Sequence, residues 1–196
     1  MMGARERPNP ESHPGTTLRR VTWSKDLNTV RRLFQDYRSW LADHQDSSAS
    51  AASRVNLGLG QVDKLIAELP GAYGPPRGDI ILAFAQEEVV ACGALRELEP
   101  RVGEIKRVYV RADHRGPGFG PRLTRELLRR AHELGYERVK VDTLPTMSAA
   151  IQFYQELGFV PVPAYWPHPV PGARFFEYTM MESPSAPRGA RTSKSK

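Results

Sequence analysis

Cysteine is nearly absent from this sequence, which carries a single one, Cys92, among 196 residues. One thiol cannot form an internal disulfide, and it cannot supply the cysteine ligands of a zinc site. Long apolar runs are also missing: none approaches the ~20 residues that a membrane-spanning helix needs, and the polar N-terminus lacks the apolar core of a signal peptide. These absences predict a cytoplasmic protein that does not associate with a membrane.

An excess of charge is missing from the body of the chain. The net charge is +6, of which residues 1–20 carry +2 and residues 183–196 carry +4, so residues 21–182 are neutral overall. Basic tails keep a chain soluble and attract polyanions only weakly. Because the body shows no basic face with interleaved aromatic residues, the sequence does not predict specific nucleic-acid binding.

The pattern of apolar residues predicts one α/β domain over residues 18–182. Residues 1–17 and 183–196 are rich in Pro, Ser, Gly or basic residues, and we expect them to be disordered tails. Apolar residues recur at helical spacing in four segments: 24–41, 60–69, 118–134 and 146–157. Extended segments are expected at 18–23, 79–85, 88–96, 104–111, 138–143, 159–162 and 174–181.

The order of these segments predicts how the strands pair. Short loops join the three strands between residues 79 and 111, which favours an antiparallel meander. A helix connects the strands at 104–111 and 138–143, so these two should form a parallel pair in a βαβ unit.

A glycine-rich run, Arg-Gly-Pro-Gly-Phe-Gly, spans Arg115 to Gly120 and lies between a predicted strand and a predicted helix. Glycine has no Cβ, so the backbone can approach a ligand closely. A helix that begins there directs unpaired amides and the positive end of its dipole at the ligand. The run therefore predicts a phosphate-binding site.

Two common phosphate motifs fit this run poorly. A P-loop needs Lys-Ser/Thr after its last glycine, whereas Pro121-Arg122 follow Gly120. A dinucleotide site needs glycine directly after the strand and an acid about twenty residues on. Asp142 lies at a suitable distance, but five residues separate the strand from Gly116, so the dinucleotide interpretation is a minor alternative.

A third interpretation accounts for more residues. The run from Arg115 to Gly120 resembles the acetyl-CoA loop of the GNAT acyltransferase superfamily, Gln/Arg-x-x-Gly-x-Gly/Ala. Residues 149–159, Ala-Ala-Ile-Gln-Phe-Tyr-Gln-Glu-Leu-Gly-Phe, resemble the second signature of that family. The two signatures stand in the expected order, and the resemblance covers roughly residues 18–182.

The resemblance implies a single domain with a mixed twisted β-sheet flanked by helices. It implies acetyl-CoA as cosubstrate, no metal, and direct transfer of the acetyl group to an amine of a small molecule or a peptide. Two alternatives stay open: a domain that binds CoA without transfer, and the dinucleotide-binding domain. Dimers are common in this superfamily, so a homodimer is one expectation, and the sequence leaves the oligomeric state open.

The resemblance also places the cofactor and the general acid. The residues implied in cofactor binding are Val108, Tyr109, Val110, Arg115, Gly116, Pro117, Gly118, Phe119, Gly120 and Pro121. The two prolines have no N–H, so this loop offers fewer donors than is usual in the family. Tyr154 matches the acid that protonates the departing thiolate; the alternative is a core aromatic that packs on Phe153.

The candidates for the acceptor side are less specific. Glu104 matches a base of some family members, and the alternative is an exposed strand-edge carboxylate paired with Lys106 or Arg101. His114 and Asp142 are weaker candidates, and Met147 stands where the family often has Asn. A Pro-rich loop between the last two strands is expected to cover the acceptor pocket, or to be a surface loop with its Trp on the body; it holds Tyr165, Trp166, His168 and Arg174. Cys92 is expected to be a buried filler.

Overall fold

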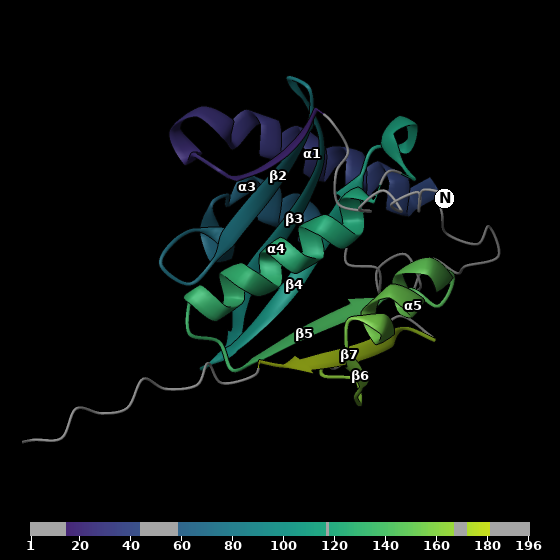
Figure 1. The fold of residues 1–196 in the computed structure, drawn as a ribbon. Coiled ribbons are helices and arrows are strands. Elements are labelled where there is room, and N and C mark those ends of the chain that lie inside the picture. Colours follow the sequence, from purple (N-terminus) through teal and green to yellow (C-terminus); the bar gives the residue numbers. More distant parts are fainter. Residues whose placement is uncertain (1–14, 44–58, 117, 167–171, 181–196) are drawn as a thin grey trace, which may run out of the picture.

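The structure, a computed structural model, describes residues 15–43, 59–116, 118–166 and 172–180 of the chain (Figure 1). The two expected tails lie outside these residues, except for the last part of the N-terminal one. Four α-helices are described: α1 (Trp23–Asp43), α3 (Leu59–Ala67), α4 (Phe119–Glu133) and α5 (Ser148–Glu156). Two short 3-10 turns accompany them: η1 (Gly71–Tyr73) and η2 (Ala112–His114).

The described strands form one seven-stranded mixed sheet in the order β1-β2-β3-β4-β5-β7-β6. Their bounds are β1 (Thr16–Arg20), β2 (Asp79–Ala85), β3 (Glu88–Glu99), β4 (Val102–Val110), β5 (Arg138–Thr143), β6 (Val160–Pro161) and β7 (Arg174–Thr179). The antiparallel meander β2-β3-β4 and the parallel pair β4-β5 confirm the predicted pairing. Only this one pair of the sheet is parallel, which argues against a dinucleotide-binding fold with its mostly parallel sheet.

The first strand and the first helix both begin earlier than predicted. Strand β1 begins at Thr16, inside the expected tail, because it pairs with β2 from Thr16 opposite Ala85 onward. Helix α1 begins at Trp23, before the predicted cap Ser24. The carboxylate of Asp26, in the first turn, accepts a hydrogen bond from the amide of Thr22 at 2.7 Å and so holds the residue that precedes the helix.

Alternation along the central strands divides the core into two layers. On one face, Ile81 and Ala83 of β2 pack with Leu123 and Leu127 of α4. On the other face, Ile80 and Leu82 pack with apolar residues of α1 and α3. Each fully buried Leu or Ile contributes about 1.5–3 kcal/mol. The layers hold α4 and α5 on the face opposite α1, as Figure 1 shows.

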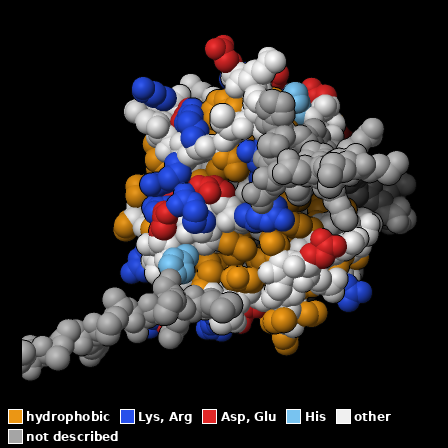
Figure 2. Space-filling model, in the orientation of Figure 1, with side chains coloured by type: hydrophobic (Ala, Val, Ile, Leu, Met, Phe, Trp, Pro, Cys, Tyr) orange, Lys and Arg blue, Asp and Glu red, His pale blue; other side chains and the backbone are white. Residues whose placement is uncertain are grey.

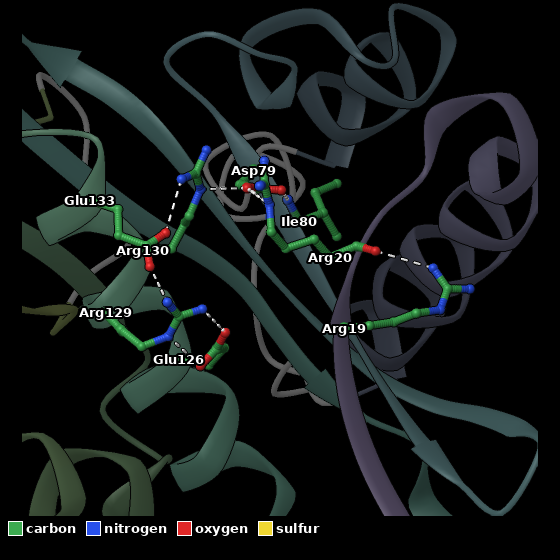
Figure 3. Close-up of polar contacts among 8 residues, drawn as sticks. All are labelled: Arg19, Arg20, Asp79, Ile80, Glu126, Arg129, Arg130 and Glu133. Atoms are coloured by element: carbon green, nitrogen blue, oxygen red, sulfur yellow. Dashed lines mark hydrogen bonds and ion pairs between the residues drawn. The ribbon is translucent and has the colours of Figure 1, made fainter.

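A buried carboxylate anchors α4 to the sheet. Oδ2 of Asp79 accepts hydrogen bonds from Nε of Arg20 at 2.5 Å and from Nε of Arg130 at 2.7 Å (Figure 3). Its Oδ1 accepts the amide of Ile80 at 2.9 Å. Because Asp79 is only 5% exposed, both its oxygens need such partners. The junction fixes the position of α4 and so of the helix end that carries the glycine-rich loop.

Candidate active site

Strands β4 and β5 pair only at their beginnings. Their register runs from Val102 opposite Arg138 to Glu104 opposite Lys140 and then ends, although β4 continues to Val110 and β5 to Thr143. In Figure 1 the two strands diverge from their paired ends, and α5 lies at the end toward which they open. Residues 105–110 therefore have main-chain groups on the β5 side that no strand pairs.

A bulge in β4 gives the physical reason for this separation. The register of β4 with β3 shifts between Cys92 and Ala94, and Arg107 has a φ of +57°. A bulge adds an unpaired residue and bends the strand. Side chains beyond the bulge still pack on both faces, since Val108 contacts the α4 side and Tyr109 the α1 side.

The glycine-rich loop forms an open cradle at the start of α4. Gly116 and Gly118 have φ values of +102° and +77°, which residues with a side chain rarely adopt. A Cβ added at Gly116, Gly118 or Gly120 would meet nothing within 4 Å, so the space before the loop is free. Gly118 precedes the helix without a side-chain cap, which leaves the amides of Phe119 and Gly120 for a ligand. Such a cradle fits a diphosphate.

The remaining predicted loop residues contribute in different ways. Arg115 folds back: its Nε donates to the carbonyl of Val110 at 3.1 Å, and its guanidinium lies 5.1 Å from the Trp40 ring centroid. Pro121 lies in the first turn of α4, where a missing N–H costs little. Pro117 lies outside the described residues. Figure 2 shows hydrophobic side chains gathered on the surface between α5 and α4, the helix that follows this loop.

Tyr154 lies on α5, within an aromatic cluster. Its ring centroid is 5.4 Å from that of Phe159 and 6.2 Å from that of Phe176, and the residue is 6% exposed. Burial raises the pKa of this phenol above its ordinary 10.0, and the charges of Asp142 and Tyr37 raise it further. Tyr154 therefore keeps its proton at neutral pH.

Glu104 is fully buried at the last position where β4 pairs with β5, so the alternative of an exposed strand-edge carboxylate is wrong, although its pairing with Lys106 is found. Its Oε2 accepts a hydrogen bond from Nε of Arg96 at 2.7 Å. Its Oε1 lies 3.4 Å from Nζ of Lys106 and accepts the hydroxyl of Tyr165 at 3.2 Å. The other expected partner, Arg101, instead pairs with Glu137. Both oxygens of the Glu104 carboxylate therefore have partners: two cationic side chains and one phenol.

Tyr165 and Trp166, which precede β7 in the chain, contact this cluster. The Trp166 ring lies 5.1 Å from the guanidinium carbon of Arg96 and 5.2 Å from Nζ of Lys106. Tyr165 packs edge-on against Phe175 with ring centroids 5.1 Å apart. Trp166 thus packs on the body of the protein.

The other candidates are dispersed. Asp142 joins the cluster through Lys106, whose Nζ lies 2.5 Å from its Oδ1. His114 lies in η2, with Nε2 at 3.7 Å from a carboxylate oxygen of Asp113. Arg174 lines a hollow with residues of α5, and His168 lies outside the described residues. Met147 precedes α5, and its sulfur lies 3.4 Å from the Thr143 hydroxyl.

Three residues of this region were not predicted from the sequence: Arg96, Arg107 and Tyr73. Arg96 follows Cys92 and Ala94 at alternate positions of β3, so a charged residue on an otherwise apolar strand face was a usable signal. No local pattern marks Arg107, because the bulge that turns it inward arises from pairing with β3. Tyr73 comes from a turn far from the two signatures.

Within the described ranges, no three His, Cys, Asp or Glu residues are grouped so that they could hold a metal ion. None of the described helices is long and apolar enough to cross a membrane. Cys92 is fully buried, as expected.

Comparison with known proteins agrees with this geometry. A curated relative, an uncharacterised N-acetyltransferase of Schizosaccharomyces pombe, is 29% identical over 164 residues, which are 82% of this chain and 92% of the relative. The solved PaiA N-acetyltransferase of Thermoplasma acidophilum, in complex with coenzyme A, aligns with a TM-score of 0.62 and 16% identity, over 84% of this chain and 99% of that one. YncA of Salmonella typhimurium, a putative acetyltransferase solved with acetyl-CoA, aligns with a TM-score of 0.58 and 15% identity, over 90% and 100% of the two chains.

These solved structures share the fold, a mixed sheet flanked by helices. Residues 27–159, which include both signatures and the separated strands, match the acetyltransferase (GNAT) family. The chain therefore belongs to the GNAT acetyltransferase family.

Proposed function

We propose that this protein transfers the acetyl group of acetyl-CoA to an amine, of a small molecule or a peptide, by direct attack in a ternary complex. The observation that carries the proposal is the end of β4–β5 pairing at Glu104 and Lys140. The glycine-rich start of α4 and the phenol of Tyr154 belong to the helices that flank the separated strands. Bound coenzyme A and acetyl-CoA in two structural neighbours support the choice of cosubstrate.

In this proposal, the chain holds acetyl-CoA with its backbone. The amides of Phe119 and Gly120 and the positive end of α4 bind the diphosphate, which the open sides of Gly116 and Gly118 admit. The unpaired main-chain groups of 108–110 bind the pantetheine arm. An amide of this segment polarises the thioester carbonyl and stabilises the oxyanion that forms on attack.

The proton transfers involve two further groups. The amine attacks as its neutral form, so its ammonium must first lose a proton. Glu104 is fully buried under two cations, so a proton reaches it only through the Tyr165 hydroxyl or a water molecule. When the carbon–sulfur bond breaks, Tyr154 donates its proton to the thiolate and coenzyme A leaves as the thiol. The proton that the attacking nitrogen loses on becoming an amide returns the phenolate to the phenol, directly or through water.

Two observations favour a second candidate, a domain that binds CoA without transfer. The occupied carboxylate of Glu104 is not a free base, and Met147 replaces the Asn that the family often has. Both features leave the cradle of the loop intact. Binding would then persist without turnover.

Two measurements separate these candidates. Calorimetry with acetyl-CoA, and with NAD as the reference dinucleotide, tests the binding site; tighter binding of NAD would overturn the proposal at its first step. Release of CoA thiol in the presence of an amine panel then tests transfer, with Tyr154→Phe as the matched variant. Turnover by the wild type and a large loss in the variant support transfer, whereas acetyl-CoA binding by both proteins without turnover selects the binding domain.

A further inference from the structure

A positive charge without a counter-ion lies beside the proposed reaction centre. Arg107 is partly buried at the bulge of β4, and its guanidinium carbon lies 5.4 Å from the Tyr37 ring centroid. Its Nε is buried and has no hydrogen-bond partner among the residues that the structure describes. The charge of the Asp142 carboxylate acts on Arg107, but Oδ1 of Asp142 lies 2.5 Å from Nζ of Lys106 and is paired with that side chain. Because charges lose hydration on burial, a guanidinium in this setting normally has an anionic partner.

The neighbouring charges compensate one another. Arg96 and Lys106 together hold Glu104, and Lys106 also holds Asp142. Two cations therefore balance two carboxylates. Arg107 adds one positive charge that no ion pair among the described residues neutralises.

Two other polar groups here are buried without a partner. The hydroxyl of Tyr73 is one, on a residue that is only 1% exposed. Arg107, Arg96, Lys106 and Glu104 are the charges that act on it, so it faces the same cluster. The second is Nε1 of Trp166, whose ring covers Arg96 and Lys106. These two groups and Nε of Arg107 can each donate a hydrogen bond. Together they favour a ligand that accepts hydrogen bonds.

We propose that the acceptor is an amine that also carries a carboxylate, such as a free amino acid, and that Arg107 and the Tyr73 hydroxyl bind this carboxylate. The inference rests on the proposed transfer and names its substrate class. A guanidinium and a carboxylate match as planar, two-point partners. One unbalanced positive charge also suits a carboxylate better than a phosphate, which carries about −1.5 to −2 at neutral pH.

The position of Arg107 fits an acceptor that reaches the thioester. Tyr37, which packs against the Arg107 guanidinium, is also one of the groups whose charge acts on the Tyr154 phenol. Arg107 and Tyr154 therefore have Tyr37 as a common neighbouring group. A carboxylate held there fixes the amine of the same molecule toward the cosubstrate, which reduces the entropy cost of attack.

The test compares each free amino acid of a panel with its own amide, which has the same amine and no negative charge. CoA release by the full-length protein gives kcat and KM for both substrates. We expect kcat/KM for at least one free acid to exceed that of its amide by about 10- to 100-fold, the range for a hydrogen bond to a charged group. Arg107→Gln should erase this preference by raising KM for the acid, while KM for acetyl-CoA is unchanged.

Two matched variants complete the design. Tyr73→Phe keeps the ring that packs on Phe34 and removes only the hydroxyl, so it should raise KM for the acid by a smaller factor. Arg129→Gln removes the same charge from the exposed side of α4 and should change neither KM. If Arg107→Gln fails to fold, the inference is tested by the ratio of kcat/KM for acid and amide in the wild type and by the KM of Tyr73→Phe for the acid.

Several outcomes would overturn the inference. Transfer to amides or simple amines as fast as to acids would refute the acceptor class and leave the proposed transfer standing. A raised KM for acetyl-CoA in Arg107→Gln would assign Arg107 to the cosubstrate. Equal KM values for the acid in wild type and Arg107→Gln would mean that the guanidinium does not bind the acceptor. Acetyl-CoA binding without acetylation of any free amino acid or amide would refute the acceptor class, and the broader amine panel described above would then decide whether the proposed transfer stands.

Discussion

Nζ of Lys106 lies 2.5 Å from Oδ1 of Asp142, and this ion pair joins the two strands beyond the point where their pairing ends. The Lys106 side chain is only 12% exposed, and it also approaches the buried Glu104. The pair therefore bridges β4 and β5 where no main-chain hydrogen bonds do. It sets how far apart the two strands lie at the paired end of the opening.

Asp142→Asn tests this bridge through stability. The variant leaves a nearly buried ammonium with one partner fewer, so the free energy of unfolding should fall by about 1–3 kcal/mol. Urea unfolding at neutral pH measures the change. Asp63→Asn removes an exposed ion pair with Arg38 and should cost less than about 1 kcal/mol. An equal loss in both variants would contradict a bridging role.

The same pair predicts a pH dependence. Burial alone would lower the pKa of Lys106, but the attraction of Asp142 and Glu104 outweighs it and raises the pKa above 10.5. A raised pKa stabilises the fold fully below 10.5, and this contribution is lost as the pH rises through the folded-state value. The unfolding free energy of the wild type should therefore fall in this alkaline range, and that of Asp142→Asn should fall less. Parallel curves for the two proteins would refute the assignment.

Tyr154→Phe tests the proton donor. The ring, and with it the packing on Phe159 and Phe176, is retained, so melting temperature and acetyl-CoA affinity should stay close to wild type. Loss of a general acid typically lowers the rate by about 100-fold or more. Steady-state CoA release measures kcat. Because burial raises the pKa of this phenol above 10.0, the wild-type rate should show no loss from Tyr154 below that pH. Unchanged kcat in the variant would remove Tyr154 from the mechanism.

Gly118→Ala and Gly135→Ala form a matched pair at the two ends of α4. Both glycines have a left-handed φ, +77° and +80°, and a Cβ at either would meet nothing within 4 Å. Each alanine should therefore cost about 1–2 kcal/mol through the same backbone strain. Only Gly118→Ala puts a methyl group into the cradle for the diphosphate, so only this variant should weaken acetyl-CoA binding in calorimetry. Equal affinities would place the diphosphate elsewhere.

Cys92 provides a check on the packing of the sheet. The residue is fully buried, and burial raises the pKa of its thiol to about 12. Thiolate is the reactive form, so the folded protein should react with a thiol reagent only when it unfolds. Labelling with and without denaturant measures this difference. Rapid labelling of the folded protein would show that the layer between α1 and the sheet opens readily.

The amino-acid sequence by itself determined the helices and strands and the glycine-rich loop at the start of α4. The helical spacing of Leu123 and Leu127 and the alternation along β2 follow from local chemistry, and the glycine run at the start of α4 is written in consecutive residues. These features can be predicted because apolar spacing, helix caps and glycine conformations depend on residues that are close together in the sequence.

Only the tertiary structure decided how the site is completed. Pairing with β3 places the bulge at Arg107, a residue whose left-handed φ no local pattern demands. Burial converts Glu104 from an expected surface carboxylate into the centre of an ion-pair cluster. Tyr73, Asp142 and Trp166 reach that cluster from distant segments. Contacts between such segments arise from packing, and packing minimises the free energy of the whole chain rather than of any one stretch of it.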